Sequence, residues 1–375
     1  MTQPMRLVLV TETFPPEING VARTLGRWAD TFRERGHTVH VIRPRQLGER
    51  RGFGLVYGRP LPSYHQVRIG IAGPWRLRHF LRRLSPDLVH IATEGPLGLS
   101  ALLASRWLGI PVASSFHTNF DHYAAHYGFL ALERLGFAYL RWFHNRTRVT
   151  LVPSQATRSR LLADGVKRVE IWSRGVDGAV FSPAHRDESL RASVGVAPSD
   201  TLLVYVGRLA PEKNLPARLQ AFSRLRALIP QVRLALVGGG PLTEGLLRST
   251  PAGVVLAGEQ RGANLSRWYA SGDLFAFPSQ SETFGNVVLE AQASGLAVVG
   301  FDCQGVNEQV IPGINGLLVP PEGDLVPALA ELCLDPARRR AMGEAARTRA
   351  LGLDWKPIFD DLESRYRGLI AGRLL

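Results

Sequence analysis

The stretch SETFGNVVLEAQASGLAVV, residues 281–299, decides how its part of the chain folds. An apolar strand ends just before it, helical spacing begins near Gly285, and a second apolar strand starts at Ala297. Strand, turn, helix and strand in this order are typical of a parallel sheet with helices on its faces. Two carboxylates, Glu282 in the turn and Glu290 in the helix, lie in an apolar setting, where each needs a partner.

The same alternation of strand and helix runs outward through both halves of the chain. In the first half we expect strands at Arg6–Val10, His37–Ile42, Asp87–Ile91, Val112–Ser115 and Val149–Pro153. In the second half we expect them at Thr201–Val206, Val232–Val237, Val254–Ala257, Leu274–Pro278 and Ala297–Gly300. The pattern predicts an α/β protein with two doubly wound, Rossmann-like domains that face each other across a cleft.

Glycine and proline interrupt the pattern in VDGAVFSPAHR, residues 176–186, which places the domain boundary there. We therefore expect a first domain over residues 1–180 and a second over 181–355. The amphipathic segment over 356–375 is expected to pack back on the first domain.

Composition narrows the class of protein. The chain has 375 residues, 45% of them hydrophobic and 21% charged, as in soluble globular proteins. Its apolar runs are too short for a secretory signal or a membrane-spanning helix. Two cysteines, Cys303 and Cys333, without a CxxC motif indicate a reducing compartment. We therefore expect a cytoplasmic protein.

The formal net charge of +13 lies in one half of the chain. Residues 1–180 hold 25 Lys and Arg against 12 Asp and Glu, whereas residues 181–375 hold 20 of each kind. A one-sided positive field suits an anionic surface such as phospholipid or nucleic acid. The alternative is a general arginine bias of the source organism.

Three glycine-containing turns follow expected strands. In TETFPPEINGVARTL a helix begins after Asn19 and Gly20, and its free N-terminal N–H groups predict a phosphate site. The alternative is a plain turn capped by Asn19. In YVGRLAPEKN, Gly207 precedes Arg208 and Lys213, two cations suited to phosphate oxygens, unless they are solvated surface groups. Gly238, in VGGGPLTEGL, indicates a close backbone approach but no dinucleotide fingerprint.

The carboxylates of Glu282 and Glu290 come from different elements, a loop and a helix. A carboxylate that accepts two vicinal hydroxyls is a common reader of a ribose or sugar edge. The pair is therefore predicted to flank a phosphate-binding helix start at Gly285 and Asn286. The alternative is a solvated helix residue and a helix cap.

Together, the E-x7-E pair, the VGRLAPEKN turn, the PPEINGVA loop and SFHTNF resemble glycosyltransferase family 4. The resemblance runs from about residue 6 to about residue 320 and is strongest to bacterial enzymes that transfer mannose from GDP-mannose to lipids. It implies a retaining, nucleotide-sugar-dependent enzyme of the GT-B fold, with donor on the second domain and acceptor on the first. It also implies that no bound cofactor or metal is needed beyond the nucleotide-sugar co-substrate.

The resemblance assigns roles to individual residues. Glu290 would hold the ribose hydroxyls, Glu282 would lie beside the donor sugar, and His117 would contact the sugar near the acceptor. Arg208 and Lys213 would neutralise the diphosphate, which Gly20 would approach from the other domain. The remaining donor contacts are backbone groups near Asn19, Gly207, Gly238, Phe284, Gly285, Asn286 and Val287.

A metal at His117, His122 and His126 is not expected, because the sequence offers no carboxylate partner or further ligand at a suitable spacing.

Two arginine-rich segments bear on the acceptor. Residues 73–91 and 128–148 combine apolar stripes with arginines and aromatics, the composition of helices that lie on membranes. The alternative is that both stripes are core faces, which the first segment favours. With the charge asymmetry, this predicts peripheral binding to the anionic inner face of the cell membrane. No nucleic-acid reader pattern is found, so no nucleic-acid partner is expected.

The sequence thus predicts a hexosyltransferase acting from a nucleotide sugar, GDP-mannose favoured, on a lipid or glycan hydroxyl. UDP-glucose or a UDP-uronate remains an alternative donor. A sugar-nucleotide epimerase of the same fold is the alternative of another reaction class.

Overall fold

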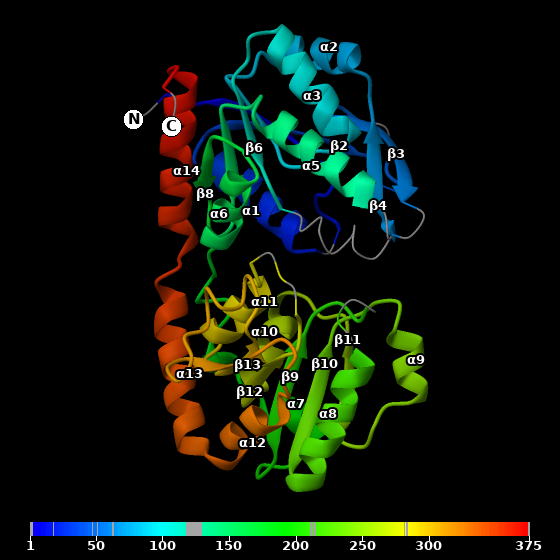
Figure 1. Ribbon diagram of the computed structural model, residues 1–375, viewed down its shortest axis with the longest axis vertical. Helices are drawn as coiled ribbons and strands as arrows, with labels where there is room; N and C mark the ends of the chain where they lie inside the picture. Colours follow the sequence, from blue (N-terminus) through cyan, green and yellow to red (C-terminus); the bar gives the residue numbers. More distant parts are fainter. Residues whose placement is uncertain are drawn as a thin grey trace. The chain divides into compact units, whose positions relative to one another are not determined.

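The computed structural model describes residues 3–17, 19–46, 48–50, 52–61, 64–117, 130–210, 213, 215–280, 282 and 284–373. The chain divides into two compact units (Figure 1). Unit 1 holds Met1–Ser173 and Lys356–Leu375, and unit 2 holds Arg174–Trp355. The chain therefore leaves unit 1 once and returns to it with its last helix. Of the expected SFHTNF motif, the residues after His117 lie outside the described part of the chain.

Unit 1 is built on one sheet with the strand order β4-β3-β2-β1-β5-β6-β7-β8. The strands pair in parallel except β3 and β4, which form an antiparallel hairpin. Their bounds are β1 Arg6–Val10, β2 Thr38–Pro44, β3 Leu55–Leu61, β4 Tyr64–Ile71, β5 Leu88–Ile91, β6 Val112–Ser115, β7 Val149–Val152 and β8 Val169–Ile171. Because the order reverses at β1, the loops after β1 and β5 diverge and leave a crevice for ligands between them.

Helix α1 shows why the local sequence adopts this form. It spans Gly20–Glu34, and Asn19 caps it by accepting the Ala22 N–H at 2.7 Å. Its apolar residues at helical spacing, Leu25, Trp28 and Phe32 among them, are fully buried. The other helices of unit 1 are α2 Pro74–Leu84, α3 Pro96–Trp107, α5 Leu130–His144, α6 Gln155–Ala163 and α14 Trp355–Ile370.

Unit 2 contains an all-parallel sheet with the order β11-β10-β9-β12-β13-β14. The strands are β9 Thr201–Val206, β10 Val232–Val237, β11 Val254–Gly258, β12 Leu274–Phe277, β13 Val298–Phe301 and β14 Gly316–Val319. The central strands β9, β12 and β13 are buried along nearly their whole length, as parallel strands covered on both faces are. Here the order reverses between β9 and β12.

The connections of unit 2 are mostly helical. They are η1 Pro183–His185, α7 Glu188–Ser193, α8 Leu215–Leu228, α9 Thr243–Arg248, α10 Gly262–Ser271, α11 Asn286–Ala293, α12 Val326–Leu334 and α13 Pro336–Leu351. One continuous apolar core joins them to the sheet, from Val196 to Met342.

Each strand expected from the sequence is present, and the two Rossmann-like sheets confirm the predicted fold class. The sequence reasoning missed β3, β4, β8 and β14. The β3–β4 hairpin contains Gly58 and Pro60, which interrupt a strand pattern, and β8 and β14 span only three and four residues.

Candidate functional site

The two loops at the switch point of unit 2 carry most of the side chains expected to act. The loop after β9 begins at Gly207, leaves Arg208 exposed, and continues to Lys213. The loop after β12 carries Ser279 and Glu282. In open α/β sheets, ligands bind at the carboxyl ends of the strands where the order reverses. The expected cation turn and the first expected carboxylate therefore lie at one crevice.

Lys213 and Glu282 contact each other directly. Nζ of Lys213 pairs with Oε1 of Glu282 and also donates to Oγ of Ser279 at 2.8 Å. Lys213 is 17% exposed and Glu282 is 22% exposed, so water screens the pair only partly. Ser279 is buried, and the sequence reasoning did not single it out. Ser279 and Glu282 together hold the ammonium of Lys213 at the carboxyl end of β12.

Glu290 is buried inside α11, unlike a solvated helix residue. Its Oε2 accepts the hydroxyl of Tyr269 on α10 at 2.9 Å. Tyr269 itself is buried and packs edge-on against Phe181, with 5.6 Å between ring centroids. The Tyr269 bond therefore orients the carboxylate, and Tyr269 is a positioning group that the sequence alone did not reveal.

The turn before α11 is shaped by Gly285. It adopts φ of +78°, a left-handed conformation that favours glycine, and serves as the helix N-cap. Gln309 stabilises this turn, because its Nε2 donates to the carbonyl oxygens of Phe284, Gly285 and Gly305. The N-terminus of α11, with Asn286 and Val287 in its first turn, thus begins beside Glu282, as a phosphate-binding helix would.

Gly238 lies where two loops of unit 2 touch. A Cβ at this position would come within 1.9 Å of the carbonyl oxygen of Gly207. Backbone hydrogen bonds from Leu209 to Gly239 and from Leu242 to Leu209 join the same loops. The close approach predicted for this glycine is therefore to the Gly207 turn, which Gly238 allows to sit directly against β10.

In unit 1 the loop after β1 holds Asn19 and Gly20. Beyond its capping bond, Asn19 donates from Nδ2 to Oγ1 of Thr13 at 2.7 Å. The same hydroxyl of Thr13 donates to Glu17 at 2.6 Å. Gly20 opens α1 at the carboxyl end of β1. This network ties the cap of α1 to Thr13 and Glu17, at the carboxyl end of β1.

Sequence reasoning missed two carboxylates at this crevice, Glu12 after β1 and Glu94 after β5. Burial raises the pKa of Glu12 to about 7, and its carboxylate accepts the N–H of Leu97. Oε1 of Glu94 lies 3.2 Å from Nε2 of His144, and both residues are buried. Their positions after neighbouring strands were the signal that could have found them.

His117 follows β6 and is buried, with 8% exposed. Its Nε2 lies 2.8 Å from Oγ of Ser115, and its ring packs edge-on against Trp172 at 6.0 Å between centroids. His117 is thus fixed within unit 1. The structure brings Arg208, Lys213, Glu282 and Glu290 into unit 2, and Asn19, Gly20 and His117 into unit 1.

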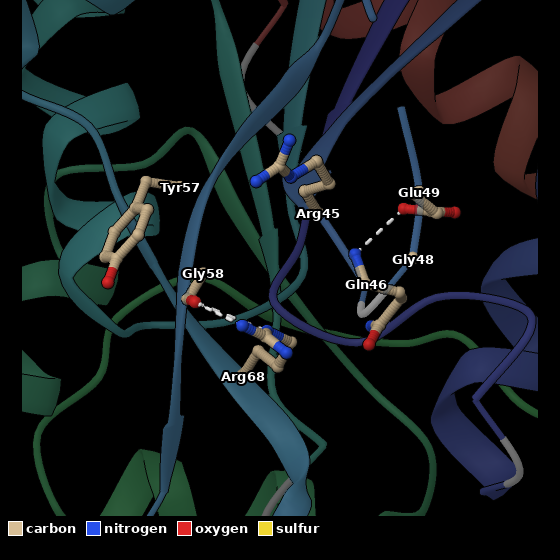
Figure 2. Close-up of a pocket in the computed structure, with 7 residues that line it drawn as sticks. All are labelled: Arg45, Gln46, Gly48, Glu49, Tyr57, Gly58 and Arg68. Carbon is tan, nitrogen blue, oxygen red and sulfur yellow. Dashed lines mark hydrogen bonds between the residues drawn. The ribbon is translucent and has the colours of Figure 1, made fainter. Parts of the chain in front are cut away.

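A cavity of about 170 Å³ lies in unit 1, beyond the end of β2 (Figure 2). Its lining comes from the segment that follows β2 and from strands β3 and β4. Arg45 and Arg68 line it, and Nη2 of Arg68 donates to the carbonyl oxygen of Gly58 at 2.7 Å. The carboxylate of Glu49, also at the cavity, is held by both terminal nitrogens of Arg43. The arginines give this cavity a positive lining.

Within the described ranges, no group of three or more His, Cys, Asp or Glu side chains is arranged to hold a metal ion. Nor does any helix in the described part of the chain have the length and apolarity to cross a membrane.

Comparison with known proteins agrees with this architecture. Residues 18–180 match Glycosyltransferase Family 4, and residues 186–349 match Glycosyl transferases group 1. The chain is 36% identical to a GDP-mannose-dependent alpha-mannosyltransferase of Mycolicibacterium smegmatis, over 99% of each chain. It is 32% identical to the sulfoquinovosyl transferase of Arabidopsis thaliana, over 95% of this chain and 72% of that relative.

Solved structures show the same fold. Sucrose-phosphate synthase from Thermosynechococcus elongatus superposes with a TM-score of 0.76 at 18% identity, covering 98% of this chain and 100% of that one. The two Rossmann-like units have the GT-B fold, and the family matches and named relatives identify a hexosyltransferase. The chain belongs to glycosyltransferase family 4.

Proposed function

We propose that this enzyme transfers a mannosyl group from GDP-mannose to a hydroxyl of a lipid-linked acceptor, with retention of the anomeric configuration. The observation that carries the donor side is the convergence of Lys213, Glu282 and the α11 N-terminus at one switch point, with Glu290 buried in the same helix. The choice of donor is supported by three relatives, 31–36% identical and all named GDP-mannose-dependent alpha-mannosyltransferases.

Each group has a defined task in this reaction. The ribose hydroxyls bind the carboxylate that Tyr269 orients, and the diphosphate lies against Lys213, Arg208 and the α11 N-terminus. As the glycosidic bond breaks, the leaving diphosphate gains negative charge, which Lys213 and Arg208 stabilise. A leaving phosphate oxygen takes the proton of the acceptor hydroxyl on the same face of the sugar, which gives retention. These steps require no metal ion.

The acceptor side is proposed for unit 1. Relatives named sulfoquinovosyl transferase and alpha-monoglucosyldiacylglycerol synthase point to a glycolipid product. Trp75 on α2 and Trp107 on α3 are 70% and 46% exposed and lie with their ring centroids 4.7 Å apart. Arg78 lies 5.9 Å from the Trp75 ring. An exposed tryptophan pair beside arginines suits the interface of an anionic bilayer on the cytoplasmic side.

The apolar stripe of α2 is mostly core, and that of α5 is buried in part. Leu77 and Leu81 of α2 are fully buried, and so is Phe143 of α5. Trp142 is 36% exposed with the Arg146 guanidinium 4.1 Å above its ring. The proposed contact with the bilayer therefore lies on the Trp75–Trp107 pair and the arginines around it, and not on the apolar stripes.

The donor is tested by thermal denaturation with GDP-mannose, UDP-glucose and a UDP-uronate, followed by product analysis with a lipid extract, with and without a chelator. GDP-mannose is expected to raise the midpoint most and to yield an α-mannosylated lipid that the chelator does not suppress. Protection by a UDP-sugar alone would overturn the choice of donor. Suppression by the chelator would overturn the metal-free mechanism.

The membrane proposal is tested by sedimentation with vesicles of phosphatidylcholine, with and without phosphatidylglycerol. We expect binding only with the anionic lipid, and binding weakened by the Trp75→Ala/Trp107→Ala double variant. Equal recovery in the supernatant with both vesicles would contradict it.

A further inference from the structure

A line of hydrogen bonds crosses the core of unit 1 and ends at His117. Nε1 of Trp28 donates to Oη of Tyr366 at 3.1 Å, and this hydroxyl lies 2.5 Å from Nδ1 of His90. Nε2 of His90 lies 2.9 Å from Oγ of Ser115, which in turn lies 2.8 Å from Nε2 of His117. Four of the five side chains are fully buried, and His117 is 8% exposed.

The direction of this line follows from its first member. An indole N–H can only donate, so the Tyr366 oxygen accepts from Trp28. The single proton of the Tyr366 hydroxyl is then available to Nδ1 of His90. Burial raises the pKa of Tyr366 above its ordinary value, so the hydroxyl keeps that proton.

The remaining bonds are determined one after another. Because Nδ1 of His90 accepts from Tyr366, the ring carries its proton on Nε2. That nitrogen donates to Oγ of Ser115. The serine hydroxyl, having accepted, donates its own proton to Nε2 of His117. A neutral His117 that accepts at Nε2 carries its proton on Nδ1.

The reverse direction leaves a buried group without a partner. If Nδ1 of His90 carried the proton, the Tyr366 oxygen would accept from both Trp28 and His90. Its own proton would then have no acceptor within this line of bonds. An unsatisfied buried donor costs more than the bond it replaces. The forward direction therefore dominates.

We propose that Tyr366, His90 and Ser115 are positioning residues that hold His117 in the tautomer protonated on Nδ1. His117 then offers an N–H donor to the sugar it is expected to contact. This rests on the proposed function and on the contact with the sugar near the acceptor that the sequence leads us to expect for His117. With the other tautomer, the same nitrogen would present a lone pair and could only accept.

The proposal gives the C-terminal helix a role in the reaction. Tyr366 is supplied by α14, which belongs to unit 1 although it follows unit 2 in the chain. Ion pairs fix the register of α14, from Arg35 to Glu363 at 3.0 Å and from Arg365 to Glu170 at 3.0 Å. The tautomer of His117 thus depends on the last part of the chain being in place.

The first test reads the tautomer without any substrate. The full chain, labelled with ¹⁵N-histidine, is studied at pH 8 by long-range ¹H–¹⁵N correlation, which separates protonated from unprotonated ring nitrogens. Signals of His117 are assigned by difference with His117→Gln. We expect Nδ1 to be protonated in the wild type. Tyr366→Phe and Ser115→Ala should shift His117 towards a mixture of tautomers, whereas Tyr139→Phe, which removes a hydroxyl outside this line, should not.

Kinetics provide the second readout. Tyr366→Phe keeps the ring and its packing, so we expect the KM for GDP-mannose to stay the same and kcat to fall about 2- to 10-fold, the loss of one hydrogen bond. A wild-type His117 protonated on Nε2, or unchanged nitrogen signals in both variants, would overturn the proposal. Shifted signals with unchanged kcat would overturn its catalytic part. Failure of GDP-mannose to bind the wild type would instead contradict the proposed function, because the tautomer is measured without it.

Discussion

Replacing Lys213 with alanine should remove the group that stabilises the departing diphosphate. Nζ of Lys213 is held by Ser279 and Glu282 at the carboxyl ends of β9 and β12 and is shielded from water for most of its surface. The charge on the leaving group grows as the bond to the sugar breaks, so Lys213 matters more in the transition state than in the bound donor.

The size of the effect follows from Coulomb's law. A unit charge at about 4 Å from the ammonium, with an effective dielectric constant of about 20, is stabilised by about 4 kcal/mol. That corresponds to about 10³-fold in rate. The neighbouring carboxylate of Glu282 offsets part of this field. We therefore expect kcat to fall by about 10²- to 10³-fold, with the affinity for GDP changing by less than about 10-fold.

The assay is steady-state transfer at saturating GDP-mannose, with calorimetric titration of GDP alongside. Lys356→Ala is the matched control, because that lysine is 78% exposed and paired with Asp360 at a helix surface. Such exposed pairs contribute about 0–1 kcal/mol, so the control should retain full turnover. A Lys213→Ala enzyme as fast as its parent at saturating donor would refute the assigned role, and so would an equal loss of GDP affinity.

Three further predictions concern other parts of the structure. Glu290→Gln keeps the hydrogen bond to Tyr269 but removes the negative charge. Calorimetry should therefore show that GDP-mannose binds about 10- to 100-fold more weakly. Unchanged affinity would exclude Glu290 from the donor site. Gly238→Ala forces a Cβ against the Gly207 carbonyl oxygen and should lower the free energy of unfolding by about 1–3 kcal/mol. Gly245→Ala, with open space around the new Cβ, should leave it unchanged. Equal melting curves for the two variants would contradict this prediction. Glu12 has a folded-state pKa of about 7 against an ordinary 4.5, so the folded state binds a proton that the unfolded state has lost between these pH values. The contribution of Glu12 to the free energy of unfolding is therefore fully present below about pH 4.5 and is lost as the pH rises to 7. Urea denaturation should show a decline of up to about 3 kcal/mol over this range, and the Glu12→Gln variant should not show it.

The fold could be predicted because parallel strands are locally encoded. The runs at Arg6–Val10 and Thr201–Val206 are continuous apolar stretches followed by glycine-containing or proline-containing turns, and β1 and β9 have these bounds. The hairpin of β3 and β4 lacks such a signal. Its strands contain glycine, proline and arginine, and their pairing depends on the edge of β2 rather than on their own sequence.

The residues proposed for the donor side were singled out from motifs, but the contacts that orient them could not be predicted. Spacing placed Lys213 and Glu282 on separate loops, yet only the tertiary structure shows that they pair across 69 residues. Tyr269 and Gln309 act through side-chain bonds to positions 21 and 24 residues away, which no local pattern encodes. The line of hydrogen bonds from Trp28 to His117 joins α1 to Tyr366, which is 338 residues later in the chain.

The most direct test of the central claim is a crystal structure of the complex with GDP-mannose. The account predicts the ribose hydroxyls on the carboxylate of Glu290, and the diphosphate between Lys213, Arg208 and the N-terminus of α11. A nucleotide bound elsewhere in unit 2, with these groups more than hydrogen-bond distance from it, would contradict the account.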